Sequence, residues 1–238
     1  MISIFSSTAF FFPFFDSTMI LVLPAFALAM WAQWKVKSTY RKFSEVRSRL
    51  GMTGEQVARR ILDQNGLHDV PVVPVAGELT DHYDPRDRKV SLSEGIFAST
   101  SLSALAVASH EVGHAIQHKV GYAPMSWRAS LVPVANIGSM AAMPLFLIGM
   151  FVPSISWMMD LGIIFFGAAL LFQLVTLPVE FDASSRAVAI LGNGSFLAPD
   201  EVDGAKRVLN AAAWTYVAAA SVSLMTMLRL IILRNSRD

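Results

Sequence analysis

Two histidines and a glutamate stand at spacings that suit a metal site. His110 and His114 are four residues apart, and Glu111 directly follows the first. Positions i and i+4 lie on one face of a helix, so both imidazoles can reach one zinc ion while Glu111 points at a water on the metal. Zinc lowers the pKa of such a water to about 7, and Glu111 can pass its proton to a leaving amine. These residue types therefore predict hydrolysis of a peptide bond.

The segment around this pattern is typical of a helix. Residues 101–117 contain no proline, carry Glu111 as their one fixed charge and place apolar side chains at helical spacing, namely Leu102, Leu105, Ala106, Val112, Ala115 and Ile116. Polar groups on so apolar a helix are costly unless they are satisfied, which favours a metal site over an amphipathic helix with histidines facing water. His118 continues the series and could orient a ligand or face solvent.

Composition places this helix in a membrane protein. The chain has 238 residues, 54% of them hydrophobic, and a mean hydropathy of +0.49, which is too apolar for an ordinary soluble domain. The absence of cysteine excludes disulfides and thiolate zinc ligands, so ligands must come from His, Asp and Glu. A net charge of +1 gives no indication of nucleic-acid binding.

Four stretches are long and apolar enough to cross a bilayer core of about 30 Å: 17–34, 131–152, 156–178 and 211–233. An outward N-terminus would make 35–128 and 186–207 cytosolic, and these segments hold sixteen of the nineteen Lys and Arg residues. Three arginines disagree with this orientation, so the last helix could instead be tilted, have snorkelling arginines or be interfacial: Arg229, Arg234 and Arg237. We expect three to four spans in the cytoplasmic membrane, with the active site on the cytosolic side.

An aromatic run at residues 10–15 precedes the first span. It has no Lys or Arg ahead of it, so it lacks the charged start of a secretory signal peptide. We expect an uncleaved segment that lies at the interface or is partly inserted.

The segment between the first two spans has room for a folded domain. Residues 35–50 are interpreted as a helical extension of the first span, whose cations could rest on anionic headgroups or belong to a solvated linker: Lys35, Lys37, Arg41 and Lys42. Thr53 and Gln56 resemble a capping box, and Asn65-Gly66 is a usual helix end. The apolar positions of that helix predict packing rather than chemistry.

Residues 71–93 change to a strand pattern. Residues 72–75 suggest one strand, and 79–83 with 89–93 flank a turn-like Asp-Pro-Arg-Asp, which predicts a short hairpin. We expect the strand containing Val90 and Leu92 to offer an exposed edge to an extended substrate, with a purely structural ribbon as the alternative.

Topology selects the third zinc ligand. The carboxylates after His114 are Asp160, Glu180, Asp182, Asp200, Glu201, Asp203 and Asp238. Two spans separate His114 from Glu180, and two crossings return the chain to the face that it left. Glu180 can therefore meet the histidines, although an ordinary charge at a helix end is the alternative reading.

These residues carry a family resemblance. The resemblance lies in three motifs: DHYDP at 81–85, HEVGH at 110–114 and VEFDAS at 179–184, the last two being joined by spans. With these motifs the chain resembles the YugP-type neutral zinc metallopeptidases of bacterial membranes. The resemblance covers the chain from the first span onward, including 32–39 and 122–136. That family is similar in layout to the heat-shock and CAAX-prenyl membrane zinc proteases. The resemblance implies one zinc ion per chain on His110, His114 and Glu180, with Glu111 as general base.

One position departs from the better-known proteases. They carry an aspartate four residues after the ligand glutamate, where this chain has Ser184, and Asp182 could act as the outer partner instead. Donors to the developing negative charge of the carbonyl oxygen are expected among His82, Tyr83 and Arg186.

The expected fold is a mainly α integral membrane protein with three to four transmembrane helices and a small cytosolic α+β, zincin-like domain that contains the hairpin. The expected parts are 1–34 (N-terminal segment and first span), 35–130 (catalytic domain), 131–178 (transmembrane hairpin), 179–210 (third ligand) and 211–238 (last span and tail). Expected partners are a peptide or membrane-protein substrate, lipid, and another copy or a membrane partner protein. An inactive zinc-binding scaffold and a metal-handling transporter are the rival functions.

Overall fold

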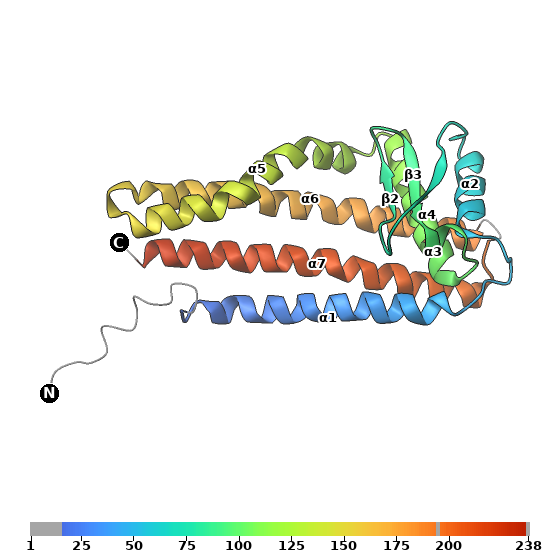
Figure 1. Ribbon diagram of the computed structural model, residues 1–238, viewed down its shortest axis with the longest axis horizontal. Helices are drawn as coiled ribbons and strands as arrows, with labels where there is room; N and C mark the ends of the chain where they lie inside the picture. Colours follow the sequence, from blue (N-terminus) through green and yellow to red (C-terminus); the bar gives the residue numbers. More distant parts are fainter. Residues whose placement is uncertain (1–15, 194–195, 237–238) are drawn as a thin grey trace. The chain divides into compact units, whose positions relative to one another are not determined.

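The computed structural model describes residues 16–193 and 196–236 (Figure 1). The aromatic run at 10–15 lies outside these residues. The elements in chain order are α1 (Met19–Ser44), α2 (Gly54–Gln64), β1 (Val72–Val75), β2 (His82–Asp84), β3 (Lys89–Ser93), α3 (Glu94–Phe97), α4 (Leu102–Lys119), α5 (Ala123–Phe151), a 3₁₀ turn (Pro153–Ile155), α6 (Trp157–Asn193) and α7 (Pro199–Asn235).

Four helices of the described residues are long and apolar enough to cross a membrane: α1, α5, α6 and α7. Each continues beyond the apolar stretch recognised in the sequence. α6 runs through Pro178 to Asn193, and α7 begins at Pro199. A proline in a helix removes a single backbone donor, which a long helix tolerates when its neighbours support it. Glu180 therefore lies within α6 rather than after it.

The chain forms two compact units, and the first holds much of the apolar helices: Met1–Met30, Leu131–Gln173 and Ala218–Asp238. Glycines bring α5 and α6 into close contact in this unit. A Cβ on Gly138 would meet the carbonyl oxygen of Phe165 at 2.6 Å, and one on Gly162 would meet that of Ala142 at 2.7 Å. Small residues at helix crossings are typical of packing within membranes.

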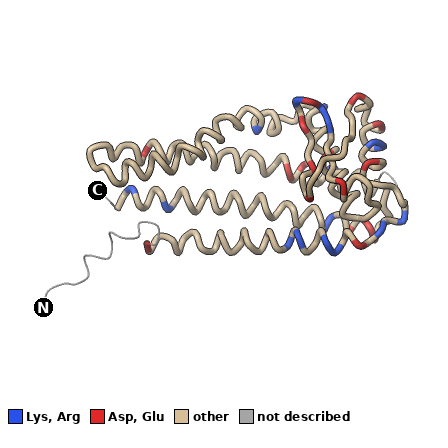
Figure 2. Tube along the Cα trace, viewed as in Figure 1, with Lys and Arg blue, Asp and Glu red and all other residues tan. Residues whose placement is uncertain are grey.

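The arginines near the end of α7 have acidic partners in the same unit. Arg234 Nε lies 2.7 Å from Asp160 Oδ1, and Arg229 Nη2 lies 3.6 Å from Asp16 Oδ1. Figure 2 shows charged residues near the ends of the long helices, with long uncharged runs between them. Two of the three arginines that disagreed with the orientation are thus paired with aspartates. Arg237 lies outside the described residues.

The second unit comprises Trp31–Ser130 and Leu174–Val217 and contains a three-stranded sheet in the order β1-β3-β2. β2 and β3 form the predicted hairpin, with Tyr83 opposite Val90. The predicted capping box is present, since Gln56 N donates to Thr53 Oγ1 and Thr53 N donates to Gln56 Oε1. α2 and α4 pack together over the core of this unit.

The prediction that the strand with Val90 and Leu92 offers a free edge is wrong. β1 pairs with β3 in parallel, so β3 is the central strand and both of its backbone edges are occupied. This pairing joins segments across a longer connection, which the alternation within a hairpin does not encode. The edges of the sheet belong to β1 and β2, and β2 contacts α4.

Candidate metal centre

α4 carries the two histidines and Glu111 into the interior. Its first turn is capped because Ala104 N donates to Ser101 Oγ. Glu111 and His114 are 8% and 7% exposed, and the side chain of His110 is 14% exposed. Polar groups at this depth need specific partners.

A glycine within the motif lets α6 approach α4. A Cβ on Gly113 would meet the carbonyl oxygen of Ala183 at 2.8 Å and its Cα at 3.2 Å. The two backbones are therefore in direct contact at this point. Glu180 lies about one helical turn before Ala183 on α6, which brings its carboxylate over the histidines.

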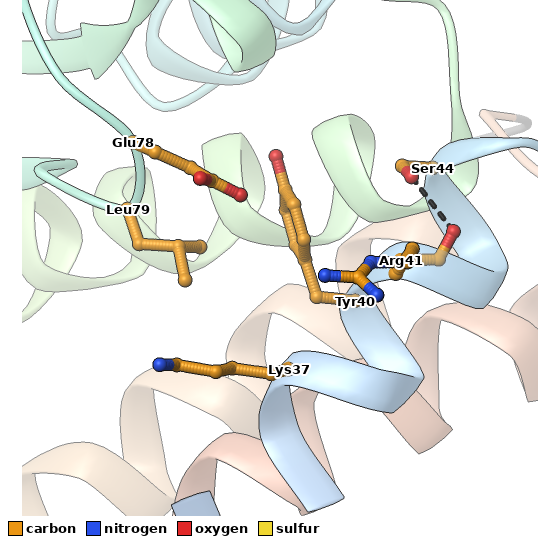
Figure 3. A pocket seen from close by; sticks show the side chains of 6 residues that line it. All are labelled: Lys37, Tyr40, Arg41, Ser44, Glu78 and Leu79. Atoms are coloured by element: carbon orange, nitrogen blue, oxygen red, sulfur yellow. Dashed lines mark hydrogen bonds between the residues drawn. The ribbon is translucent and has the colours of Figure 1, made fainter. Parts of the chain in front are cut away.

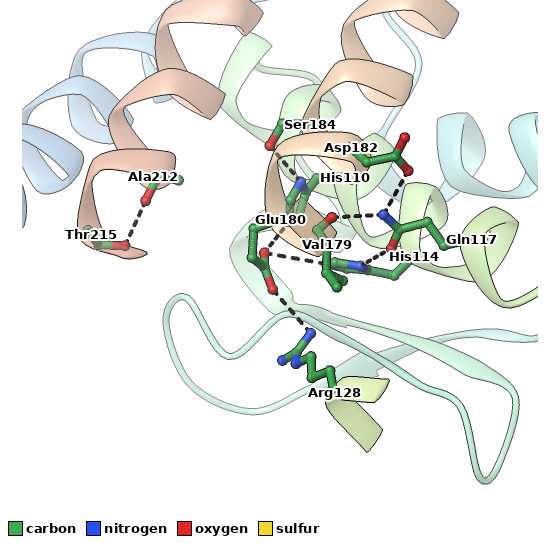
Figure 4. Close-up of polar contacts among 10 residues, drawn as sticks. All are labelled: His110, His114, Gln117, Arg128, Val179, Glu180, Asp182, Ser184, Ala212 and Thr215. Atoms are coloured by element: carbon green, nitrogen blue, oxygen red, sulfur yellow. Dashed lines mark hydrogen bonds and ion pairs between the residues drawn. The ribbon is translucent and has the colours of Figure 1, made fainter. Parts of the chain in front are cut away.

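The three expected ligands converge. Glu180 Oε2 lies 3.3 Å from His110 Nε2 and 3.6 Å from His114 Nε2, and a ligand atom from each residue lies within 4.8 Å of the others (Figure 4). Tetrahedral zinc with bonds of about 2.1 Å holds its ligand atoms about 3.4 Å apart. The nitrogen and oxygen donors also suit zinc, so this group could hold the ion.

The protonation of His114 reflects its carboxylate neighbours. Burial disfavours the imidazolium, but the hydrogen bond to Glu180 and the negative charge of Glu111 outweigh it, so the pKa of His114 is raised. The carboxylates around His114 therefore favour positive charge at this point.

His114 has a buried outer partner that the sequence analysis missed, Gln117. Gln117 Oε1 lies 2.9 Å from His114 Nδ1, while its Nε2 donates to the Val179 carbonyl and to Asp182 Oδ2. The amide oxygen thus holds Nδ1 and orients the ring so that Nε2 is the nitrogen that faces Glu180. A polar residue three positions after a ligand on an apolar helix was the available signal.

His110 has its own partner, because Ser184 Oγ lies 3.2 Å from its Nδ1. Asp182 reaches the site only through Gln117, and Arg186 Nε donates to Asp182 at 2.6 Å. Ser184 and Asp182 are therefore not alternatives for one position. Each supports a different histidine, the first directly and the second through an amide.

Arg128 is the second residue that the sequence analysis missed. Its Nη1 lies 3.2 Å from Glu180 Oε1, the oxygen that faces away from the histidines, and about a third of its side chain is exposed. Tyr216 on α7 also interacts with Glu180. Arg128 resembled an ordinary charge flanking a span, and only the fold shows that it lies beside the ligand carboxylate.

The remaining predicted donors have partners other than the three ligand residues. His82 is exposed, and its Nδ1 lies 2.8 Å from the Thr80 carbonyl oxygen. The Tyr83 hydroxyl lies 2.8 Å from Nδ1 of His118, which joins β2 to α4. The contact between Tyr83 and His118 connects the edge strand to the motif helix, whereas Arg186 is engaged with Asp182.

The fold and the metal-binding group define a helical membrane-type chain with a His-His-Glu site, and the comparisons agree with that class. Residues 18–235 match the family described as "Putative neutral zinc metallopeptidase", and the chain belongs to this family. It is 53% identical over 219 residues to "Putative membrane protease YugP" of Bacillus subtilis (strain 168), an alignment that covers 92% of this chain and 97% of the relative. No solved structure matches the chain. The resemblance inferred from the sequence is confirmed.

Proposed function

We propose that the protein is a membrane-bound zinc endopeptidase in which His110, His114 and Glu180 hold one zinc ion and Glu111 is the general base. The observation that carries this proposal is the convergence of three ligand atoms from α4 and α6 within 4.8 Å of one another. Bound zinc supplies a polarised substrate carbonyl and a water of lowered pKa.

Side chains of the protein carry out the proton transfers and hold the ligands in place. Glu111 accepts a proton from the attacking water and returns it to the leaving amine. Its near-complete burial keeps bulk water from competing for that proton. Gln117 and Ser184 hold the imidazole rings in orientation, and no covalent intermediate is required.

Arg128 and Tyr216 are the best placed donors to the carbonyl oxygen of the substrate. Arg128 forms an ion pair with Glu180 and Tyr216 interacts with the same carboxylate, and the guanidinium retains N–H groups beyond the one that Glu180 accepts. Charge that develops on the substrate oxygen next to the ligands would lie within their reach. They replace His82 and Tyr83 in this role.

The edge of β2 is the proposed docking strand for an extended substrate. β2 has a neighbour on one side, β3, and contacts α4. The bond between Tyr83 and His118 ties this strand to the helix that carries the ligands. Strand addition supplies backbone hydrogen bonds without a sequence requirement, which suits cleavage of unfolded or membrane-derived segments.

The proposed setting is the cytoplasmic membrane with the metal site on the cytosolic side. Support comes from the distribution of the basic residues along the chain, sixteen of nineteen of which lie in the two segments proposed to be cytosolic. Membrane proteins or their unfolded segments are the proposed substrates.

Glu111→Gln in the purified full chain tests the mechanism. The amide cannot accept the proton, so we expect unchanged zinc content and a fall of about 10²–10⁴ in peptide cleavage. Glu94→Gln, an exposed carboxylate on α3, is the matched control and should cleave normally. Cleavage by Glu111→Gln at the parent rate would contradict the assigned base.

The parent protein distinguishes the rival functions. A zinc-loaded parent that cleaves neither casein nor membrane-protein substrates would favour a scaffold. If proteoliposomes that contain the parent protein transport zinc and the protein cleaves no substrate, the result would favour a transporter.

A further inference from the structure

A second polar site lies in the unit that holds the metal centre, and it shares no residue with that centre. It is a cavity of about 370 Å³ lined by Lys37, Tyr40, Arg41, Ser44, Glu78 and Leu79 (Figure 3). We propose that this pocket binds the headgroup of a zwitterionic phospholipid with a primary amine, with the phosphate at Lys37 and Arg41 and the ammonium at Glu78.

The charges of the pocket are arranged for a ligand that carries both signs. Lys37 and Arg41 are four residues apart on α1 and therefore share a face of the helix. Glu78 belongs to the loop between β1 and β2 and faces them across the pocket. Within residues 16–193 and 196–236, none of these three groups forms an ion pair, so each is open to an opposite charge on a ligand.

The position of the pocket along α1 matches the headgroup layer. Trp31 and Trp34 are 41% and 64% exposed, and exposed tryptophans of membrane helices gather at the lipid–water interface. With a rise of 1.5 Å per residue, Lys37 stands about 4.5 Å and Arg41 about 10.5 Å beyond Trp34. The headgroup layer is about 5–8 Å thick on each side of the bilayer core. The two cations therefore bracket the level at which lipid phosphates lie.

Glu78 determines which headgroup fits. A carboxylate accepts hydrogen bonds from the N–H groups of an ethanolamine ammonium, whereas a choline group has none to donate. A glycerol headgroup carries no positive charge and leaves Glu78 unpaired beside the phosphate. The expected order of binding is phosphatidylethanolamine first, then phosphatidylcholine and phosphatidylglycerol.

Native mass spectrometry of the full chain in detergent with added phosphatidylethanolamine tests the cations. Lys37→Gln with Arg41→Gln should weaken binding roughly tenfold or more, given the usual attraction between lipid surfaces and two basic residues. Lys35→Gln with Lys42→Gln is the matched control, because it removes the same charge from exposed positions of α1 that do not line the pocket. An equal loss in both pairs would overturn the proposal in favour of diffuse attraction.

Further binding measurements identify the chemical class of the ligand. Glu78→Gln should remove the preference for phosphatidylethanolamine over phosphatidylglycerol, and an unchanged preference would overturn the role of Glu78. Inorganic phosphate should not displace the lipid at equal concentration, and displacement would assign the pocket to free phosphate instead. Unchanged thermal midpoints and zinc content in every variant keep these outcomes separate from folding and from the metal site.

Discussion

At the scale of single residues, the geometry of the candidate metal centre depends on the side chains that hold His110, His114 and Glu180 in place as much as on these three residues. Each histidine has one ring nitrogen toward Glu180 and the other toward a polar partner, Gln117 or Ser184. Such partners fix the tautomer and the ring orientation. The family pattern predicts the ligands, whereas the geometry shows which side chains keep these residues in place.

Gln117→Leu tests this arrangement. The change removes the acceptor for His114 Nδ1 and leaves Asp182 without the amide donor, so we expect zinc to bind 10–100-fold more weakly, measured by competition with a chelating dye. Gln64→Leu, an exposed glutamine at the end of α2, should bind zinc as the parent does. Parent-like affinity in Gln117→Leu would show that His114 is held by its packing alone.

Arg128→Met addresses the orientation of Glu180. The guanidinium holds Oε1 while Oε2 faces the histidines, so its loss frees the carboxylate to rotate and present both oxygens. We expect a changed visible spectrum of the Co²⁺-substituted protein and zinc binding about tenfold weaker, with Arg128→Lys recovering part of both. The matched control is Arg207→Met, an exposed position on α7.

The Arg128 variant also separates positioning from catalysis. If Arg128 donates to the substrate oxygen, kcat of the zinc-saturated variant should fall about 10²–10³-fold with little change in KM. A parent-like kcat together with weakened zinc binding would restrict Arg128 to positioning Glu180. Parent-like values for the spectrum, affinity and kcat together would remove it from the site.

At the scale of helices and strands, local sequence patterns predicted the features that depend on residues close together in the chain. The capping box at Thr53, the motif helix and the hairpin turn all depend on spacings within one segment. Two other features join segments that are distant in the chain: the parallel pairing of β1 with β3 and the contact between Arg128 and Glu180. The periodicity of a single segment cannot predict such contacts. The apolar spans and the helical extension of the first span were predicted, whereas the polar continuations of α6 to Asn193 and of α7 from Pro199 were not.

The crossing of α4 and α6 depends on Gly113. A methyl group there would lie 2.8 Å from the Ala183 carbonyl oxygen, so the helices must separate to admit it. Overpacking of this kind costs about 1–3 kcal/mol, and the separation also moves Glu180 from the histidines. Gly113→Ala should therefore lower both the thermal midpoint and the zinc affinity.

Gly95→Ala provides the comparison for this crossing. A Cβ on Gly95 meets no atom within 4 Å, so the change should leave stability equal or slightly higher and zinc affinity unchanged. The two variants add the same methyl group to helices of one unit. Equal behaviour of the pair would mean that the helix crossing does not set the geometry of the site.

At the scale of the whole molecule, the chain order explains how a membrane protein assembles a site from distant segments. α5 and α6 form two consecutive candidate crossings between the motif helix and Glu180. An even number of crossings returns the chain to its starting face, so a ligand can be supplied from a segment more than sixty residues away. On this topology we expect the 3₁₀ turn at Pro153–Ile155 to lie on the opposite face of the membrane.

The absence of cysteine makes this topology directly testable, because a single introduced thiol has no background. Arg86→Cys places a thiol in the β2–β3 turn, and Ser154→Cys places one between α5 and α6, both at exposed positions. In intact cells a membrane-impermeant maleimide should label Ser154→Cys, whereas Arg86→Cys should react only after permeabilisation. The positive-inside distribution requires this order, because most of the basic residues share the segment of Arg86. The reverse pattern would place the metal site outside the cell and direct the search for substrates to extracellular segments.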